Sequence, residues 1–331
     1  VLFGSLVFGL IEGRTFGWWT AEGGLTIDGW TWPLSISPIP FAFAVTLVAL
    51  VLFIWWGLRR ARLGKDPLIE FSLLGISSFR NGNIAALVVS LGEFGLILAL
   101  PLWLQFVLGF DALQVGFLLL ALAGGSFVAS GAAGAFSGKV PAVVVVRVGI
   151  LAEIIGIAWA GVIIGPDAAW GWLIPALAIY GFGVGLATAQ LTGVILQDVP
   201  VEKSGQGSGI QSTSRQVGSA LGVAILGTVL FTTTGGVLAS SLDDAGIPAA
   251  SADKVVTAVV DSAGAAIAGL EADPANAQIA DAARTAFSDG TRASALTAAG
   301  FLVIGLGATF ALGSGKRRDE DARPEERVAE S

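Results

Sequence analysis

Two carboxylates lie inside long apolar segments of this chain, where a charge is costly to place. Glu93 stands near the middle of "LVVSLGEFGLILALPLWLQ", about ten residues from the start of its segment, which is roughly 15 Å of helix rise. A charge at that depth costs roughly 2.5–3.5 kcal/mol on insertion scales. We therefore predict that Glu93 binds and releases a proton or attracts a cationic ligand. The alternative is a neutral carboxyl that bonds to a neighbouring helix. Glu153, in "VGILAEIIGIAWAG", is equally deep and is a further candidate for proton coupling.

Arg215 brings a cation into another apolar segment, "QSTSRQVGSALGVAILGTVLF". If that helix begins near residues 207–209, Arg215 lies about seven residues, or roughly 10 Å, inside it, and its long stem can reach back toward the aqueous interface. Gln211, four residues earlier, can share hydrogen bonds with it. Gly218 and Gly222 belong to a stripe of small residues that is typical of close helix packing. We predict that these four residues form a gate or packing contact rather than bind substrate directly.

The segment "LIPALAIYGFGVGLATAQLTGVILQ" carries polar side chains that can orient a ligand. Tyr180 and Gln190 offer hydrogen bonds within mostly apolar surroundings, which is the usual composition of small-molecule pockets. The rings of Phe94, Trp103 and Phe106 can face a flat hydrophobic cation, or they are plain core or lipid contacts. Together with the buried carboxylates, these groups predict a site for a hydrophobic or cationic compound.

The composition is that of an integral membrane protein. Hydrophobic residues make up 54% of the 331 residues and charged residues 13%, against about 25% in soluble domains, and the mean hydropathy is +0.79. Cys, His and Met are absent, which excludes disulfides, Cys/His metal sites and catalysis by Ser-His-Asp or Cys-His groups. No Walker motif GxxxxGK[ST] is present, which disfavours an ATP-driven pump. We predict no enzyme activity, no metal, no cofactor beyond a proton gradient and no nucleic-acid partner.

Seven hydrophobic segments are long enough to cross a bilayer, which requires about 20 residues of helix. The chain begins "VLFGSLVFGLIEG", with only 11 largely apolar residues before Glu12. We expect it to start inside a membrane helix, with an N-terminal part missing, and a cleaved signal peptide is the alternative. The pattern predicts an all-α fold, a polytopic transmembrane helical bundle with eight crossings if the initial half-span is included. The expected limits of the seven segments are 39–58, 83–104, 114–136, 142–164, 171–196, 208–231 and 293–313.

Lys and Arg are distributed unequally between the two sets of alternate connections. Fourteen of the 18 fall with the set that holds "RRARLGK" and the terminal "KRR", and four fall with the other set. Because cytoplasmic connections carry the excess of Lys and Arg, the first set is predicted to be cytoplasmic. The C-terminus is then inside, and the initial half-span runs outward.

One predicted outer connection, residues 232–292, is long, Ala-rich and acidic. Its stretch "KVVTAVVDSAGAAIAGL" places apolar residues on one face at helical spacing, so we predict a cap of two short amphipathic helices, over 254–270 and near 275–288. A flexible acidic loop is the alternative. Another outer connection, residues 12–37, holds tryptophans that we expect to anchor at the membrane interface, namely Trp18, Trp19, Trp30 and Trp32. The polar tail, residues 314–331, is expected to be disordered.

Several landmarks follow one another in an ordered series: "LVFGLIEGRTFGW", "DPLIEFSLLGISSFRNGN", "LPLWLQFVLGFDALQVG" and "SGQGSGIQSTSRQVGSALGVAILGTV". In order and spacing they resemble the C-terminal part of the major facilitator superfamily, specifically its fourteen-helix drug:proton antiporters. The resemblance implies that residues 1–61 are the remnant of helix 7 plus helix 8, an extra pair between two six-helix halves. Residues 62–313 are then the second half. The connection "GAFSGKVPAVVVVR" departs from the family pattern, because Lys139 and Arg147 stand in place of an acidic and arginine-rich signature.

The resemblance implies a bacterial inner-membrane transporter that exports hydrophobic or cationic compounds in exchange for protons, by alternating access. Its expected partners are membrane lipid, the small-molecule substrate and the missing N-terminal half. The helices of Glu93 and Tyr180 are expected to line the cavity. The helix of Glu153 is expected to be peripheral, which favours a structural role or a subunit contact there. Two alternatives stay open, a narrow-specificity metabolite transporter of the same superfamily and a non-functional truncated half-transporter.

Overall fold

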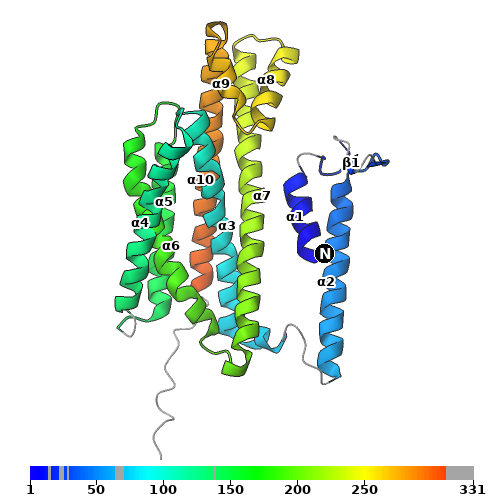
Figure 1. The fold of residues 1–331 in the computed structure, drawn as a ribbon, viewed down its shortest axis with the longest axis vertical. Helices are drawn as coiled ribbons and strands as arrows, with labels where there is room; N and C mark the ends of the chain where they lie inside the picture. The colour runs from blue at the N-terminus through cyan, green and yellow to red at the C-terminus, as the bar shows by residue number, and fades with distance from the viewer. Residues whose placement is uncertain (14–15, 22–25, 28–29, 64–70, 137–138, 311–331) are drawn as a thin grey trace, which may run out of the picture.

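The computed structural model describes residues 1–13, 16–21, 26–27, 30–63, 71–136 and 139–310. Most of these residues are helical, and the long helices run side by side along the long axis of the molecule (Figure 1). The predicted tail, residues 314–331, lies outside the described residues, so its disorder stays a prediction.

Seven of the described helices are long and apolar enough to cross a membrane, as the sequence predicts. They confirm the all-α, multi-span fold class. α1 (Leu2–Glu12) has only 11 residues and is too short to cross. The seven are α2 (Pro38–Arg62), α3 (Ser77–Phe106), α4 (Ala112–Phe136), α5 (Ala142–Ile163), α6 (Leu173–Leu196), α7 (Ser204–Asp244) and α10 (Ala277–Thr309). Single 3-10 turns join some of them: η1 (Phe71–Gly75), η2 (Trp170–Trp172), η3 (Val201–Lys203) and η4 (Pro274–Asn276).

A small antiparallel ribbon interrupts the helical pattern between α1 and α2. β1 (Thr26–Ile27) pairs with β2 (Trp30–Thr31). Nearby, the Trp32 indole nitrogen donates to the Ile36 carbonyl at 2.8 Å, and Trp19 is largely exposed. The side chain of Trp30 lies outside the described part of the chain. The predicted interfacial anchoring by these tryptophans stays a prediction.

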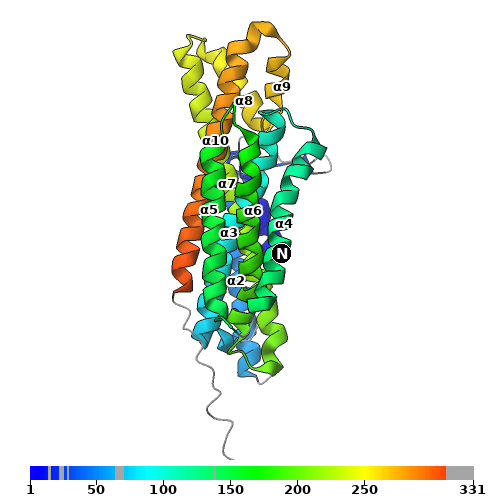
Figure 2. The same ribbon diagram turned by 90° about the vertical axis from the view of Figure 1, so that its left-hand side faces the viewer.

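Six of the long helices form one bundle, and the α1–α2 hairpin stands beside it (Figure 1). Within the bundle, α3 packs against α7 and α10, α5 packs against α6 and α10, and α4 packs against α6. The view turned by 90° shows the same helices as a tall, narrow stack (Figure 2). α2 packs mainly against α1, and only 6% of its apolar window is buried. Most of the surface of α2 is therefore left uncovered by the described residues.

Two glycines allow α7 to approach α3 closely. A Cβ at Gly218 would collide with the carbonyl of Leu87, and a Cβ at Gly222 would collide with that of Leu91. The two glycines lie one helical turn apart on the face of α7 that meets α3. This contact sets the level at which Arg215, less than one turn before Gly218, meets α3.

α7 and α10 are much longer than a bilayer requires. Their 41 and 33 residues correspond to about 60 and 50 Å of helix, against a hydrocarbon core of about 30 Å. Neither helix contains a proline, so nothing in the backbone forces it to end where the apolar run ends. Their projecting ends carry a cap formed by α8 (Ala249–Asp261) and α9 (Ala266–Glu271), at the top of Figure 1.

The cap corrects the prediction for residues 232–292. The first predicted amphipathic helix, over 254–270, is divided between α8 and α9 at a turn where Gly264 has a φ of +98° and a Cβ would also meet the Phe287 ring. The second predicted helix, near 275–288, is wrong as a separate element, because its residues form η4 and the first part of α10. The alternative of a flexible loop is also wrong, since the segment is helical and packs on α7 and α10.

An arginine below the cap joins several parts of the chain. Arg284 of α10 donates from Nη2 to the Pro166 carbonyl at 2.8 Å and from Nε to the Val107 carbonyl at 3.2 Å. Its Nε also lies 3.4 Å from Glu271 Oε1, and its Nη2 lies 4.0 Å from Asp167 Oδ1. These contacts tie α10 to α9, to the end of α3 and to the connection after α5.

Candidate functional site

A pocket opens between α3, α4, α6 and α7, near the middle of α3. Its volume is about 350 Å³, within the range of about 300–1,000 Å³ that is usual for small-molecule sites. Its apolar walls include Phe94 and Ile97 of α3, Leu122 of α4 and Val184 of α6. Three of the predicted site residues line the same pocket, Glu93, Tyr180 and Arg215.

Glu93 and Arg215 meet in this pocket. Arg215 Nη2 lies 3.9 Å from Glu93 Oε2, and the side chains are 33% and 6% exposed, respectively. α7 begins at Ser204, so Arg215 lies about 11 residues, or roughly 17 Å, into the helix, which is deeper than the sequence predicts. Its guanidinium therefore pairs with a carboxylate at mid-bundle instead of reaching back to the interface. Glu93, predicted for proton coupling, and Arg215, predicted for gating, therefore line the same pocket.

Tyr180 connects α6 to the turn of α3 that carries Glu93. Its hydroxyl donates to the Glu93 main-chain carbonyl at 3.1 Å, and its ring is buried. α5 supports Tyr180 from behind, because Gly156 packs so closely that a Cβ there would meet the Tyr180 backbone. Tyr180 therefore fixes the position of the helical turn from which the Glu93 carboxylate projects.

Glu153 lies in the wall behind this site, on α5. It is fully buried, and neither of its carboxylate oxygens has a hydrogen-bond partner among the described residues. Gly183 of α6 packs against its backbone nitrogen and its Cγ. Glu153 is also close enough to Glu93 and Arg215 for electrostatic interaction with both. It does not line the pocket, so the two predicted carboxylates occupy different environments.

The two predicted glutamines lie outside the pocket and join helices. Gln190 Nε2 donates to the Ala133 carbonyl of α4 at 3.4 Å. Gln211 Nε2 donates to Thr192 Oγ1 of α6 at 3.1 Å, and not to Arg215 as the sequence suggests. The structure therefore brings Gln190 and Gln211 into helix contacts, and a role for Gln190 in orienting a ligand stays a prediction.

Two aromatic side chains that the sequence offers as ligand contacts lie in different places. Phe94 lines the pocket, whereas Trp103 is a fully buried core residue whose indole donates to Ser288 Oγ of α10 at 3.0 Å. α4 also lines the pocket, with Ser126 and Ser130, which were not among the residues predicted from sequence. Their spacing of four residues places both hydroxyls on one face of an apolar helix, and this was the available signal.

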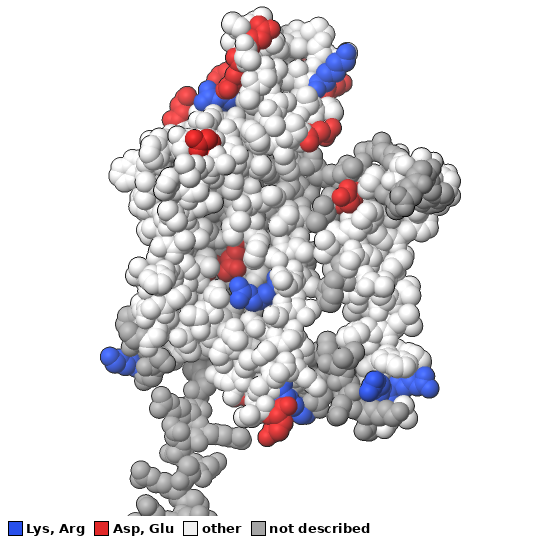
Figure 3. All heavy atoms as spheres, in the orientation of Figure 1, with Lys and Arg blue, Asp and Glu red and all other residues white. Residues whose placement is uncertain are grey.

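Charged side chains gather at the two ends of the molecule (Figure 3). The wide band between them is largely uncharged, except where an acidic patch lies beside a basic patch on the face shown. An uncharged band of this kind suits contact with lipid hydrocarbon. Within the part of the chain that the structure describes, no group of three Asp or Glu side chains is arranged to hold a metal ion.

These features define a multi-pass helical membrane protein with a charged pair in a largely apolar pocket. The chain belongs to the Major Facilitator Superfamily, whose family model matches residues 3–223. It is 31% identical over 246 residues to a "Probable actinorhodin transporter" of Streptomyces coelicolor, in a match that covers 72% of this chain and 39% of that protein. It is 27% identical over 279 residues to "Multidrug efflux pump LfrA" of Mycolicibacterium smegmatis, covering 84% of this chain and 52% of that protein.

A solved structure has a similar fold. It is the crystal structure of a bacterial homolog of the human lysosomal transporter Spinster, in an inward-facing and unoccupied conformation, with a TM-score of 0.50 and 20% sequence identity. The match covers 94% of this chain and 64% of that chain. The chain thus spans 39% and 52% of the lengths of the two curated relatives, and it shares the helical architecture of a transporter of known structure.

Proposed function

We propose that this chain belongs to a proton-coupled secondary transporter that exports hydrophobic or cationic compounds by alternating access. The observation that carries the proposal is the ion pair of Glu93 and Arg215 inside a largely apolar pocket of a membrane bundle. An ionisable pair at such depth is expensive and is a functional-site hypothesis by default. The names of the relatives, a probable actinorhodin transporter and a multidrug efflux pump, support a drug-transporting role.

The ion pair of Glu93 and Arg215 provides a way to exchange a cationic substrate for a proton. A cationic substrate that enters the pocket competes with Arg215 for the Glu93 carboxylate, while Phe94 and the aliphatic walls contact its apolar body. A proton that binds Glu93 neutralises the carboxylate and releases the cation. Because proton and cation exclude each other at one group, each lowers the affinity of the protein for the other, and this reciprocity drives exchange in opposite directions.

Glu153 stays neutral in this scheme. Arg215 pairs with Glu93, and no described cation lies within ion-pair distance of Glu153, so an ionised Glu153 would be a buried charge without a partner among the described residues. Glu153 has no hydrogen-bond donor at its oxygens among the described residues, whereas Glu93 has Arg215 and faces the pocket. We therefore assign the exchangeable proton to Glu93 and a permanently held proton to Glu153.

The same proposal assigns the chain to the fourteen-helix subfamily, as helices 7 to 14. Residues 1–61 then form the remnant of helix 7 with helix 8, residues 62–313 form the C-terminal half, and an N-terminal half of the same protein completes the transport path. The order of the sequence landmarks and the 39% share of the first relative support this assignment. The Lys and Arg distribution supports a cytoplasmic C-terminus in a bacterial inner membrane. Reading the DNA upstream of Val1 tests it, because six further spans are expected and a stop codon directly upstream contradicts it.

A narrow-specificity exporter of the same superfamily is the second candidate, favoured by the first relative, which is named for a single compound. Susceptibility testing of an efflux-deficient host that carries the complete gene separates the two. Resistance to several unrelated hydrophobic or cationic compounds is expected for the proposed function, and resistance to one compound indicates the narrow exporter. No change in susceptibility indicates a product that does not transport.

Replacement of Glu93 by Gln tests the exchange site directly. Glutamine keeps the shape of the side chain but cannot ionise, so we expect proton-driven uptake of tetraphenylphosphonium into everted vesicles, which measures export, to fall by about tenfold or more, the equivalent of about 1.4 kcal/mol. The remaining efflux should no longer depend on the pH gradient. Glu202→Gln is the matched control, because Glu202 is an exposed carboxylate in η3 outside the pocket. Unchanged efflux with an unchanged pH dependence in Glu93→Gln contradicts the proposal.

A further inference from the structure

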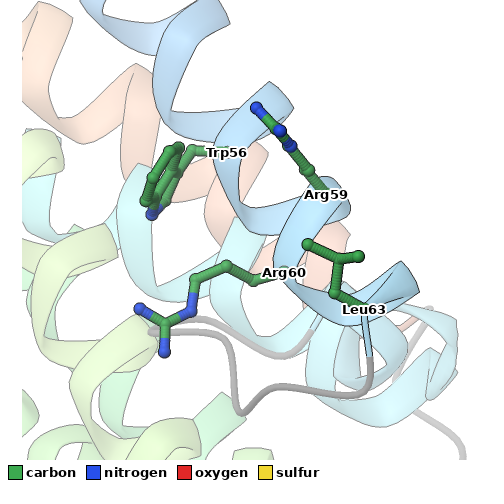
Figure 4. A pocket seen from close by; sticks show the side chains of 4 residues that line it. All are labelled: Trp56, Arg59, Arg60 and Leu63. Atoms are coloured by element: carbon green, nitrogen blue, oxygen red, sulfur yellow. The ribbon is translucent and has the colours of Figure 1, made fainter.

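A separate pocket lies at the end of α2 and shares no residue with the pocket of Glu93. It is lined by Trp56, Arg59, Arg60 and Leu63, and its volume is about 240 Å³. Figure 4 shows the Trp56 ring and the Arg60 guanidinium extending to the same side of the helix, one turn apart. Arg59 extends in another direction in the same view, so an aromatic ring, two cations and an aliphatic side chain line one pocket within two turns of one helix.

α2 carries this pocket to the level of lipid headgroups. Its apolar surface is almost entirely unburied, and Trp55 and Trp56 near its end are 53% and 51% exposed. Tryptophan and arginine at the end of a lipid-facing helix belong at the membrane interface, where the ring meets the acyl chains and the charge reaches water and headgroups. The pocket therefore opens at the boundary between acyl chains and headgroups.

The two arginines have donors available for an anion. Arg59 lies over the Trp55 ring, with its Cζ 5.3 Å from the ring centroid, a contact that uses the face of the guanidinium and leaves its edge for hydrogen bonds. Arg60 Nε is buried without a hydrogen-bond partner among the described residues. Neither arginine forms an ion pair with a described carboxylate. A guanidinium fork matches two oxygens of one phosphate group, so the charge pattern fits a phosphate.

We propose that this pocket binds the phosphate of an anionic phospholipid headgroup. Arg60 holds the phosphate beside Trp56, Arg59 adds positive charge to the same pocket, and the acyl chains lie along the exposed apolar face of α2, which includes Leu52. A free phosphate ion satisfies the arginines but leaves that apolar face and Trp56 without a partner. The pocket is also smaller than the roughly 300–1,000 Å³ of sites for drug-sized ligands, which suits a headgroup better than a transported drug. This inference does not depend on the proposed transport function.

Quenching of tryptophan fluorescence by brominated lipids tests the site, with the full chain in nanodiscs. Brominated phosphatidylglycerol in unlabelled phosphatidylcholine is compared with the reverse labelling, and the signal of a Trp55→Phe/Trp56→Phe variant is subtracted to isolate these two rings. We expect phosphatidylglycerol to be preferred over phosphatidylcholine. The preference should fall by about fivefold for each arginine replaced in Arg59→Gln and Arg60→Gln, as expected for a basic residue near an anionic surface.

Arg80→Gln is the matched control, because Arg80 is exposed near the start of α3 and does not line the pocket. It should keep the preference, and an equal loss in this variant would overturn the site in favour of general surface charge. Equal affinity of the wild-type chain for the two lipids would overturn it as well. Inorganic phosphate alone, added to the chain in detergent, should leave the fluorescence unchanged. A saturable change that Arg60→Gln removes would assign the pocket to a soluble anion and overturn the lipid assignment.

If the arginine variants do not fold, the salt dependence of the lipid preference of the wild-type chain still tests the proposal. A preference based on two guanidinium groups should weaken when salt is raised from about 0.1 M to about 1 M, because the screening length falls from about 10 Å to about 3 Å. A preference that is independent of salt would overturn the proposal.

Discussion

Arg215 and Arg284 enter the same bundle with very different sets of partners. Arg284 donates to two main-chain carbonyls, of Val107 and Pro166, and also lies within ion-pair distance of two carboxylates. Arg215 has Glu93 as its ion-pair partner, at 3.9 Å, and a third of its side chain is exposed. A guanidinium with several fixed acceptors holds helices together, whereas one with a single distant partner among the described residues can exchange that partner for a ligand.

The difference follows from where each arginine meets its neighbours. The last carbonyls of a helix have no partner within the helix, and Val107 at the end of α3 offers such an acceptor to Arg284. Pro166, in the connection after α5, offers a carbonyl outside any helix. In the middle of α3, the carbonyls accept hydrogen bonds from the helix itself, and that of Glu93 also accepts from Tyr180. The partner that Arg215 meets there is a side chain, the Glu93 carboxylate. An arginine near the helix ends is thus fixed by main-chain acceptors, whereas an arginine at mid-bundle is held by one side chain that it can leave.

The largest effect that this comparison predicts is on stability, in Arg284→Gln. The variant loses two hydrogen bonds from a charged donor to the carbonyls of the buried Val107 and the half-buried Pro166, which should lower the free energy of unfolding by about 2–4 kcal/mol. The thermal midpoint of the purified protein measures this, and transport per folded molecule should be unchanged. Lys254→Gln, an exposed cation on α8 of the same cap, is the control and should not shift the midpoint. If Arg284→Gln melts with the wild type, the proposed difference between the two arginines is wrong.

Arg215→Gln should have a smaller effect, and on binding rather than on stability. The variant removes the competitor for Glu93, and a partly exposed ion pair is worth about 1 kcal/mol or less. Tetraphenylphosphonium should therefore bind up to about fivefold more tightly, as measured by equilibrium dialysis, while its efflux slows because release is hindered. Weaker binding in Arg215→Gln would show that the guanidinium contacts substrate directly, and it would remove the argument for competition at Glu93.

The separate members of this site could be predicted from sequence, but their meeting could not. Glu93 and Arg215 each stand out as an isolated charge in an apolar run, which is a local signal. That they face each other depends on the approach of α7 to α3, which Gly218 and Gly222 permit by packing on main-chain carbonyls. Small residues in one stripe indicate that some helix comes close, but they do not identify which helix it is.

The membrane spans were predictable for the same reason, because about 20 apolar residues leave a strong local pattern. The ends of α7 and α10 were not, since both helices continue into polar, Ala-rich sequence where hydropathy gives no guide. Their continuation depends on the absence of proline and on contacts with α8 and α9 that only the folded cap provides. The position of Ser126 and Ser130 at the pocket likewise depends on how α4 is turned against α6.

The smallest effect is expected for Glu153→Gln, and it tests the distinction between a carboxylate in the pocket and one in the wall. If Glu153 is always neutral, an amide of the same shape replaces it with little change, and efflux should stay within about twofold of the wild type, or about 0.4 kcal/mol. The dependence of efflux on the pH gradient should also be retained, in contrast to Glu93→Gln measured beside it. If Glu153→Gln instead removes the pH dependence and Glu93→Gln keeps it, the exchangeable proton belongs to the buried wall. Exposure to the pocket would then not be what selects the coupling carboxylate, because Glu153 is fully buried and Glu93 is not.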